Sequence, residues 1–185
     1  MDYTLIKSKR KTMSVEIKDG EVIVRVPNRT SKRVADEFVR KHGDWIRTHL
    51  EHSRSQQEQA ASVDKLTRAQ LDALYLRARE YIPRRVRVYA DLLGEDFGRI
   101  TVRCQKTRWG SCSAKKNLNF NCLLMLTPPE VIDSVVVHEV CHLKEMNHSR
   151  RFYTLVLELC PDYRRLNSWL KENGKLLMAR VPDVP

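Results

Sequence analysis

The stretch of sequence that decides the fold reads His138-Glu139-Val140-Cys141-His142-Leu143-Lys144-Glu145-Met146-Asn147-His148. Its first five residues have the pattern H-E-x-x-H. On a helix, His138 and His142 project from the same face about one turn apart, so their imidazoles can bind one divalent metal ion. Glu139 directly follows the first histidine, which lets its carboxylate reach a water molecule on the metal. The pattern therefore predicts a zinc-dependent hydrolase with Glu139 as the catalytic general base.

His148 is expected to be the third metal ligand. A continuing helix would carry it away from the ligand face, because successive residues turn by about 100°. His148 can therefore bind the metal only if the helix ends and the chain doubles back, and residues 146–147 are the expected turn, since Asn tolerates the left-handed conformation. The spacing equals that of the pattern H-E-x-x-H-x-x-G-x-x-H, but Glu145 replaces its glycine and no Met-turn is present. Glu145 and Glu158 are alternative third ligands.

The residues that precede this run favour the metal site over a chance match. Residues 131–137 are nearly all apolar, which is typical of a buried helix. Two histidines and a glutamate inside such a helix are costly unless something satisfies them. The alternative is an amphipathic helix with surface histidines, in which His148 would be a capping or surface residue. We expect one zinc ion per chain, held by His138, His142 and His148.

The composition is that of a globular protein. The chain has 185 residues, 42% hydrophobic and 31% charged, enough for one domain or one domain with a small appendage. No run reaches the roughly 18 apolar residues of a membrane helix, and the first residues do not resemble a signal peptide. The five cysteines are odd in number and lack C-x-x-C spacing, so free thiols are expected, with a second, cysteine-based zinc site as a minor alternative. We therefore expect a cytoplasmic protein without membrane association.

The chain is strongly basic, with 34 Lys and Arg against 23 Asp and Glu and a formal net charge of +11. Basic clusters occur at residues 7–11 and 84–87. This charge favours polyanionic partners such as nucleic acid, nucleotides or acidic protein segments. A solvated basic surface that serves solubility explains it at least as well. Weak nucleic-acid binding is therefore an expectation here, and the oligomeric state is not predicted.

The first 63 residues are expected to form a region of β-hairpin and helix. Three short stretches, 3–6, 14–18 and 21–26, predict strands, and Asp19-Gly20 predicts a hairpin turn between the second and third. Thr30 or Ser31 is expected to cap a helix that ends near residue 41, and Asp44 is expected to cap another. Residues 53–63 are polar and low in complexity, which indicates a linker or an exposed extension of that helix.

Residues 64–185 are expected to form the main domain. A long helix is predicted from Thr67, kinked or divided at Pro83 and ended by Gly94. Residues 99–104 and 118–125 predict two strands on either side of a turn-rich loop.

Three further helices are predicted in this domain. Thr127 is expected to cap the helix of the H-E-x-x-H run, with prolines in its first turn. Ser149 is expected to begin the next helix, and Asp162 is expected to cap the last one, with Gly174 just past its end. Strands and helices together predict the α+β class.

Several blocks of the sequence, taken in order, resemble one known family. They are Thr107-Arg108-Trp109-Gly110-Ser111-Cys112, Leu118-Asn119-Phe120-Asn121, Pro128-Pro129-Glu130-Val131-Ile132, the H-E-x-x-H run, and Asn147-His148-Ser149 with Phe152 close behind. They resemble the YgjP-like metal-dependent hydrolases, densely over about residues 100–175 and thinly before about residue 65. The resemblance implies a zincin-like minimal metallopeptidase scaffold, with an active-site helix and a short mixed sheet whose edge strand borders the cleft. It also implies zinc held by the three histidines, with Glu139 as general base.

Five residues are candidates for contact with the substrate: Trp109, Asn119, Asn121, Arg151 and Tyr153. Trp109 either borders the cleft or anchors its loop on the metal helix. Asn119 and Asn121 share one face of their strand, and if that strand is the cleft edge, it can bind an extended peptide by strand addition. Asn121, Arg151 and Tyr153 could donate to an oxyanion, although a packed helix aromatic is the simpler interpretation of Tyr153.

Four functions remain open at this point. The first is a zinc metallopeptidase, and the second is a nucleotide pyrophosphatase, because some members of the resembling family are labelled UTP pyrophosphatase. Against the second stand the lack of a Gly-rich phosphate loop and of carboxylate clusters for Mg²⁺. The third is a nucleic-acid-associated protease of the SprT type, and the fourth is a binding module with structural zinc. Nickel or cobalt could also occupy the same three nitrogen atoms.

Overall fold

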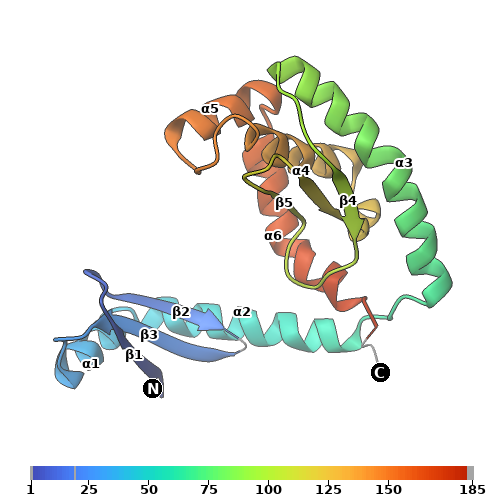
Figure 1. Ribbon diagram of the computed structural model, residues 1–185. Helices are drawn as coiled ribbons and strands as arrows, with labels where there is room; N and C mark the ends of the chain where they lie inside the picture. Colours follow the sequence, from blue (N-terminus) through green and yellow to red (C-terminus); the bar gives the residue numbers. More distant parts are fainter. Residues whose placement is uncertain (1, 19, 183–185) are drawn as a thin grey trace. The chain divides into compact units, whose positions relative to one another are not determined.

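The computed structural model describes residues 2–18 and 20–182, and the chain divides into two compact units, Met1–Ser62 and Val63–Pro185 (Figure 1). Both units contain helices and strands, so the α+β class is confirmed. All five cysteines are free thiols, as expected. Within the described ranges, no helix combines the length and the apolar character needed to cross a membrane.

The N-terminal unit is a three-stranded sheet with two helices packed against it. The strands are β1 (Thr4–Ser8), β2 (Ser14–Lys18) and β3 (Glu21–Pro27). Their order is β1-β3-β2, with β1 parallel and β2 antiparallel to β3. The helices are α1 (Lys32–Lys41) and α2 (Gly43–Ser62). Alternate valines of β3 face the helices, because side chains alternate along a strand, and the core of the unit consists of Val22, Val24, Val26, Ala35, Val39 and Ile46.

The helix predictions for this unit are largely confirmed. The Ser31 hydroxyl accepts a hydrogen bond from the backbone N–H of Val34 and so caps α1. Residues 53–62 lie within α2 and carry only exposed or half-buried side chains. The prediction of an exposed helix extension is therefore confirmed, and the alternative prediction of a linker is wrong. Of the predicted hairpin turn, Asp19 lies outside the described residues, and Gly20 has a φ of +82°.

The second unit begins with one long helix, α3 (Arg68–Leu93). Thr67 and Gln70 form a capping box at its start, and Gly94 ends it in the left-handed conformation, as predicted. Pro83 does not divide the helix. Buried residues continue at helical spacing on both sides of the proline, so packing outweighs its cost, and they are Leu74, Ala78, Ile82, Val86 and Ala90.

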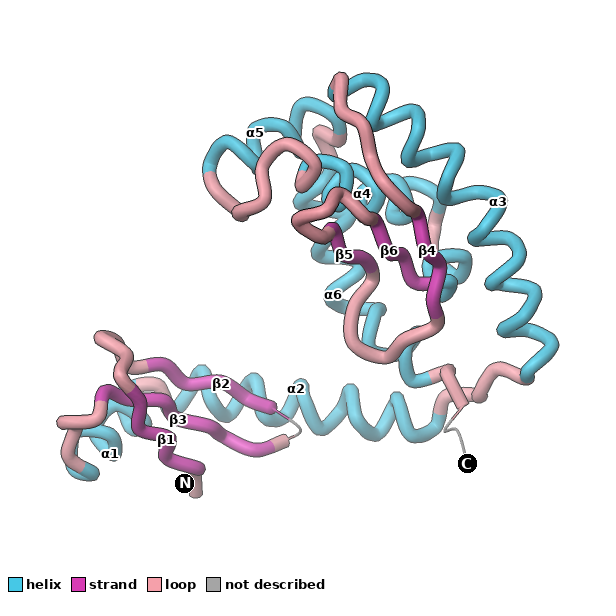
Figure 2. Tube along the Cα trace, in the orientation of Figure 1, coloured by secondary structure: helices cyan, strands magenta, loops and turns pink. Residues whose placement is uncertain are grey.

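The sheet of this unit also has three strands, β4 (Ile100–Arg103), β5 (Gly110–Cys112) and β6 (Leu118–Asn121). Their order is β4-β6-β5, with β6 parallel to β4 and antiparallel to β5 (Figure 2). The prediction of a strand through residue 125 is wrong. Residues Cys122–Leu126 form a 3-10 helix, η1, because the Asn121 side-chain oxygen accepts the backbone N–H of Leu123 and turns the chain.

The helix that carries the H-E-x-x-H run, α4 (Pro129–Cys141), packs against α3, β5, α5 and α6. It begins after Pro128, and the predicted cap at Thr127 is wrong. The Thr127 hydroxyl instead donates to the carbonyl oxygens of Leu124 and Pro128, because the residue ends η1. This central position explains why residues 131–137 are nearly all apolar.

Two helices follow, α5 (Arg150–Leu159) and α6 (Tyr163–Ala179). Ser149 caps α5 through the N–H of Phe152, as predicted. Asp162 occupies the cap position of α6 but makes no side-chain bond to the helix backbone. The prediction that Gly174 follows this helix is wrong, since Gly174 is buried inside it. A Cβ atom added to Gly174 would lie 3.1 Å from Nε1 of Trp109, so the glycine makes room for the indole ring.

Candidate metal centre

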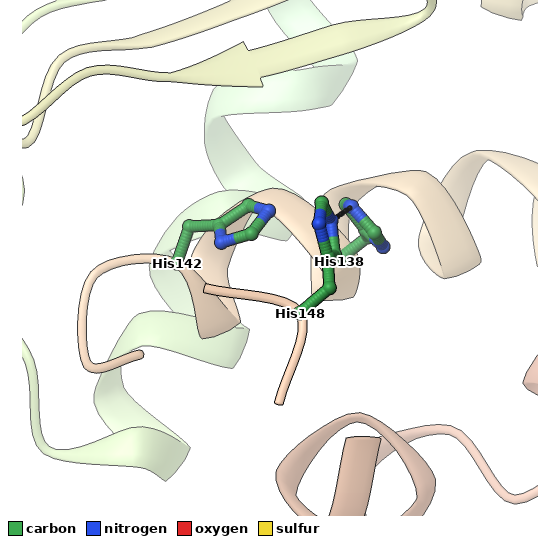
Figure 3. Close-up of side chains that lie close together, drawn as sticks. All are labelled: His138, His142 and His148. Carbon is green, nitrogen blue, oxygen red and sulfur yellow. Dashed lines mark hydrogen bonds between the residues drawn. The ribbon is translucent and has the colours of Figure 1, made fainter. Parts of the chain in front are cut away.

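Three histidines converge at the end of α4 (Figure 3). His138 lies in the last turns of α4, His142 directly follows that helix, and His148 lies in the loop before α5. Their candidate ligand atoms all lie within 4.8 Å of one another, and the Nε2 atoms of His138 and His148 are 3.1 Å apart. Nitrogen ligands on a tetrahedral zinc ion lie about 3.3 Å apart, so the cluster fits such an ion.

The chain doubles back after His142, as binding of a metal by His148 requires, but the turn differs from the predicted one. The backbone N–H of Leu143 donates to Val140, and those of Lys144 and Glu145 donate to Cys141. No residue from 142 to 149 has a positive φ, so the left-handed turn expected at residues 146–147 is wrong. The last turn of the helix tightens instead, which needs no special residue.

The two alternative third ligands do not join the cluster. Among the described residues, the group that could hold a metal ion consists of the three histidines alone. The Glu145 carboxylate lies 3.8 Å from Nε of Arg151, and its backbone carbonyl accepts from His142. The Glu158 carboxylate acts electrostatically on Cys141 instead. Nor does any cysteine belong to a metal-binding group in the part of the chain that the structure describes.

Hydrogen bonds orient two of the three imidazoles. Nδ1 of His138 lies 2.8 Å from the hydroxyl of Tyr163, and Nδ1 of His142 lies 3.0 Å from the carbonyl oxygen of Glu145. The carbonyl oxygen of Glu145 can only accept, so Nδ1 of His142 donates and its Nε2 is free for a metal. The Tyr163 hydroxyl can accept from Nδ1 of His138 in the same way, and such partners orient the ring and raise the basicity of a metal ligand. The buried ring of Phe152 contacts all three imidazoles, with centroids 4.5 to 5.0 Å apart.

The electrostatics of the cluster suit a cation. Burial, together with the charges of His142 and His148, lowers the pKa of His138 to about 4, and burial lowers the pKa of His142. Both rings are therefore neutral near pH 7, which is the form that binds metal. Burial raises the pKa of Glu139 to about 8, and the positive charge of Arg108 opposes this rise. A buried carboxylate beside three imidazoles is typical of a catalytic site.

Strand β5 lies close against the glutamate. A Cβ atom added to Gly110 would lie 2.6 Å from Cγ and from Oε1 of Glu139. Real Cβ atoms do not approach so closely, so only glycine permits this contact. Gly110 thus allows a close approach to the backbone, and the approaching group is the side chain of Glu139. The backbone of β5 in turn limits the positions that this carboxylate can adopt.

A cavity of about 170 Å³ opens beside His138 and Glu139. Trp109 lines this cavity and also packs on Gly174 of α6, so both interpretations of the tryptophan hold in part. The contact with Gly174 anchors its loop on α6. The other walls come from β5, α4 and α6, and they are Gly110, Ser134, Val135, Tyr163, Asn167 and Leu170.

The two asparagines proposed for substrate contact make different hydrogen bonds in the structure. Asn121 is fully buried, and its amide donates to the carbonyl oxygens of Gln105 and Arg108, so it holds the loop that leads to β5. Asn119 donates to the Ser111 hydroxyl across the sheet. Their strand, β6, is paired on both sides, so strand addition there is wrong. The free edge next to Glu139 belongs to β5.

The two candidates on α5 lie at the surface. Tyr153 is 42% exposed, and its ring lies 6.2 Å from that of His148, nearly parallel to it. Arg151 is exposed and faces Glu145. Two residues that act on the site were not predicted: Tyr163, through its hydrogen bond to His138, and Arg108, through its charge near Glu139. No sequence signal distinguishes Tyr163 from the other apolar and aromatic residues of its helix. Arg108 stands in the family motif before Trp109, which is the signal that could have identified it.

The fold and the site define a metal-dependent hydrolase built on an H-E-x-x-H helix. A sequence model of the YgjP-like metallopeptidase domain matches residues 11–70 and 61–173, and the chain belongs to this family. A curated relative from Escherichia coli (strain K12), named UTP pyrophosphatase, is 31% identical over 61 residues. That match covers 33% of this chain and only 36% of the relative.

A solved structure, the metallopeptidase zymogen of Pyrococcus abyssi abylysin, is similar over 51% of this chain and 96% of its own. Its TM-score is 0.46, and its sequence identity to this chain is 18%.

Proposed function

We propose that this protein is a zinc metallopeptidase, in which His138, His142 and His148 hold the metal and Glu139 is the general base. One observation carries the proposal: a buried glutamate shares a cavity with His138 of the three-histidine cluster and packs against β5, an edge strand of its sheet. Membership of a metallopeptidase-domain family supports it. The cytoplasm is the proposed compartment, because five free thiols suit a reducing environment.

When bound, zinc would act as a Lewis acid and make water acidic enough to deprotonate near neutral pH. A cation held by the three histidines would favour the carboxylate form of Glu139 and so oppose the rise in pKa that burial causes. As a carboxylate, Glu139 takes the proton of the attacking water and passes it to the leaving amine. Its side chain is confined for this task, since the space between β5 and its Cγ is too small even for a Cβ atom on Gly110. Tyr163 holds His138 in the tautomer that presents Nε2 to the metal.

The substrate proposed is an extended peptide that pairs with β5. Gly110, Ser111 and Cys112 use one edge of their strand to pair with β6, which leaves the opposite edge unpaired. A peptide added there would lie next to Glu139, with main-chain bonds giving affinity. The neighbouring cavity has Trp109, Val135 and Leu170 in its wall, so it suits an apolar side chain.

The test compares the zinc-loaded wild type with Glu139→Gln on a mixture of casein-derived peptides. Wild type should cleave peptides, and the variant should keep zinc and lose turnover, because an amide cannot accept the proton. Asp133→Asn is a control, since it also neutralises a carboxylate of α4 but pairs with Arg85 away from the site. Peptide cleavage that survives in Glu139→Gln would contradict the proposal.

A nucleotide pyrophosphatase is the second candidate, because the curated relative carries the name UTP pyrophosphatase. The same two proteins should be incubated with UTP, and pyrophosphate release should be measured. Release that depends on Glu139, without peptide cleavage, would replace the first proposal by this one. Docking on nucleic acid, as in SprT-like proteases, rests on the net charge of +11 alone, and it requires DNA affinity that falls steeply with salt.

A further inference from the structure

A second cavity, of about 360 Å³, adjoins the cavity at the metal centre. The two share Tyr163 and Asn167 in their walls, so one tyrosine side chain separates the second cavity from His138. The second cavity lies between α5 and α6. Its walls are Tyr153, Leu157, Tyr163, Arg164, Asn167, Ser168 and Lys171.

The polar wall of this cavity is one face of α6. Asn167 and Ser168 lie three and four residues after Arg164 and four and three residues before Lys171, which places the four side chains on the same side of the helix. Two of these side chains are cationic and two can donate hydrogen bonds. None of the described lining residues is acidic. The face therefore has the donor set that binds a carboxylate.

The two cations of this face are not neutralised within the described part of the unit. Other arginines nearby have carboxylate partners, since Arg165 lies 3.0 Å from Asp162 and Arg151 lies 3.8 Å from Glu145. No carboxylate within ion-pair distance of Arg164 or Lys171 occurs among the residues that the structure describes. Both side chains are exposed and available to a ligand.

We propose that this basic cavity binds an acidic side chain of the peptide substrate, and so gives the enzyme a preference for Glu or Asp near the scissile bond. The inference rests on the proposed peptidase function. The charge of the two cations is balanced by one or two carboxylates. A triphosphate carries more negative charge, and its binding would also need a cluster of carboxylates that holds Mg²⁺. Among the described residues the histidines form the one metal-binding group, so a peptide is the favoured occupant.

The first measurement is peptide binding to zinc-loaded Glu139→Gln, which cannot turn over. Short fluorescein-labelled peptides carry one Glu at successive positions of a neutral sequence, and each has a Gln-containing match. Binding should be about fivefold tighter for Glu than for Gln at one position, as expected for exposed charge pairs. Addition of Arg164→Gln and Lys171→Gln should abolish this preference and leave the affinity for the Gln peptide unchanged.

The matched control adds Arg87→Gln and Lys175→Gln, which remove the same charge from exposed positions outside the cavity. This control should keep the preference for Glu. Equal binding of Glu and Gln peptides at every position, or a preference that survives without Arg164 and Lys171, would overturn the proposal. A preference lost equally in the control would also overturn it, since net charge alone would then be responsible.

Cleavage assays on the wild type distinguish a failure of this inference from a failure of the proposed peptidase function. If peptides are cleaved without regard to acidic residues, the basic cavity has no such role and the peptidase proposal stands. If no peptide is cleaved, and UTP hydrolysis that requires Glu139 falls in the Arg164→Gln/Lys171→Gln variant, the cavity serves phosphate and both proposals fail. Thermal unfolding of each variant verifies that these surface changes leave the fold intact.

Discussion

Replacing Gly110 with alanine perturbs the general base without touching a metal ligand. The added Cβ would lie 2.6 Å from Cγ and Oε1 of Glu139 and 2.8 Å from Cδ. Carbon atoms in contact are normally about 3.5 Å apart, so the strand or the glutamate has to move by roughly 0.9 Å. Rotation of the carboxylate alone gives no relief, because Cγ itself lies 2.6 Å from the added Cβ and does not move in that rotation. We therefore expect the whole side chain to shift.

The size of the effect follows from this displacement. Misplacing a catalytic group by about 1 Å can lower the rate on the order of 100-fold. Overpacking a well-filled site costs about 1–3 kcal/mol of unfolding free energy, which a folded protein can tolerate. The three atoms nearest to the added methyl group all belong to Glu139, and none belongs to a histidine. Zinc content should therefore stay at the wild-type value while kcat/KM for peptides falls.

The assay measures kcat/KM, zinc content and thermal unfolding for Gly110→Ala beside the wild type. Gly43→Ala is the matched control, because a Cβ added there meets no atom within 4 Å. It should leave all three quantities unchanged. A folded, zinc-loaded Gly110→Ala protein with kcat/KM within about twofold of wild type would refute the assigned role of Glu139 and its contact with β5.

Three further changes test the arrangement around the site. Tyr163→Phe removes the partner of His138 Nδ1 and should weaken zinc binding about tenfold in a chelator competition, and unchanged affinity would contradict the orienting role. Asn121→Ala leaves two carbonyl oxygens without their donor and should lower the free energy of unfolding by about 1–3 kcal/mol in urea, whereas Asn119→Ala should change it little. In metal-free Glu139→Gln, the free energy of unfolding should fall as the pH drops from about 6.5 towards 4. Burial keeps His138 neutral in the folded state over this range, whereas the unfolded chain takes up the proton. Metal-free wild type should lose less over that range, since folded Glu139, with its pKa raised to about 8, is itself protonated there, and an equal loss in the two proteins would contradict this.

The metal site was predictable because its information is local. Helical spacing places His138 and His142 on one face, and the short segment to His148 allows the chain to double back, so the sequence alone predicts their convergence. The caps at Ser31, Thr67 and Ser149 were predictable for the same reason, since each depends on a few neighbouring residues.

Several of the errors concern contacts between distant parts of the chain. Strand order is set by pairing between segments, and nothing in the residues of β6 shows that β5 takes the edge position. Tyr163 is 25 residues from His138, so only the packing of α6 on α4 reveals their hydrogen bond. Gly174 was read as a helix end because glycine often has that role, whereas here it accommodates Trp109.

The most direct test of the central claim is elemental analysis of the purified protein together with peptide hydrolysis, for wild type, Glu139→Gln and His148→Ala. The proposal predicts one zinc ion per chain in the first two proteins, weakened zinc binding in His148→Ala, and cleavage by the wild type alone. Cleavage by Glu139→Gln would contradict the mechanism. Wild-type protein that binds no metal when zinc is supplied would contradict the account of the three histidines.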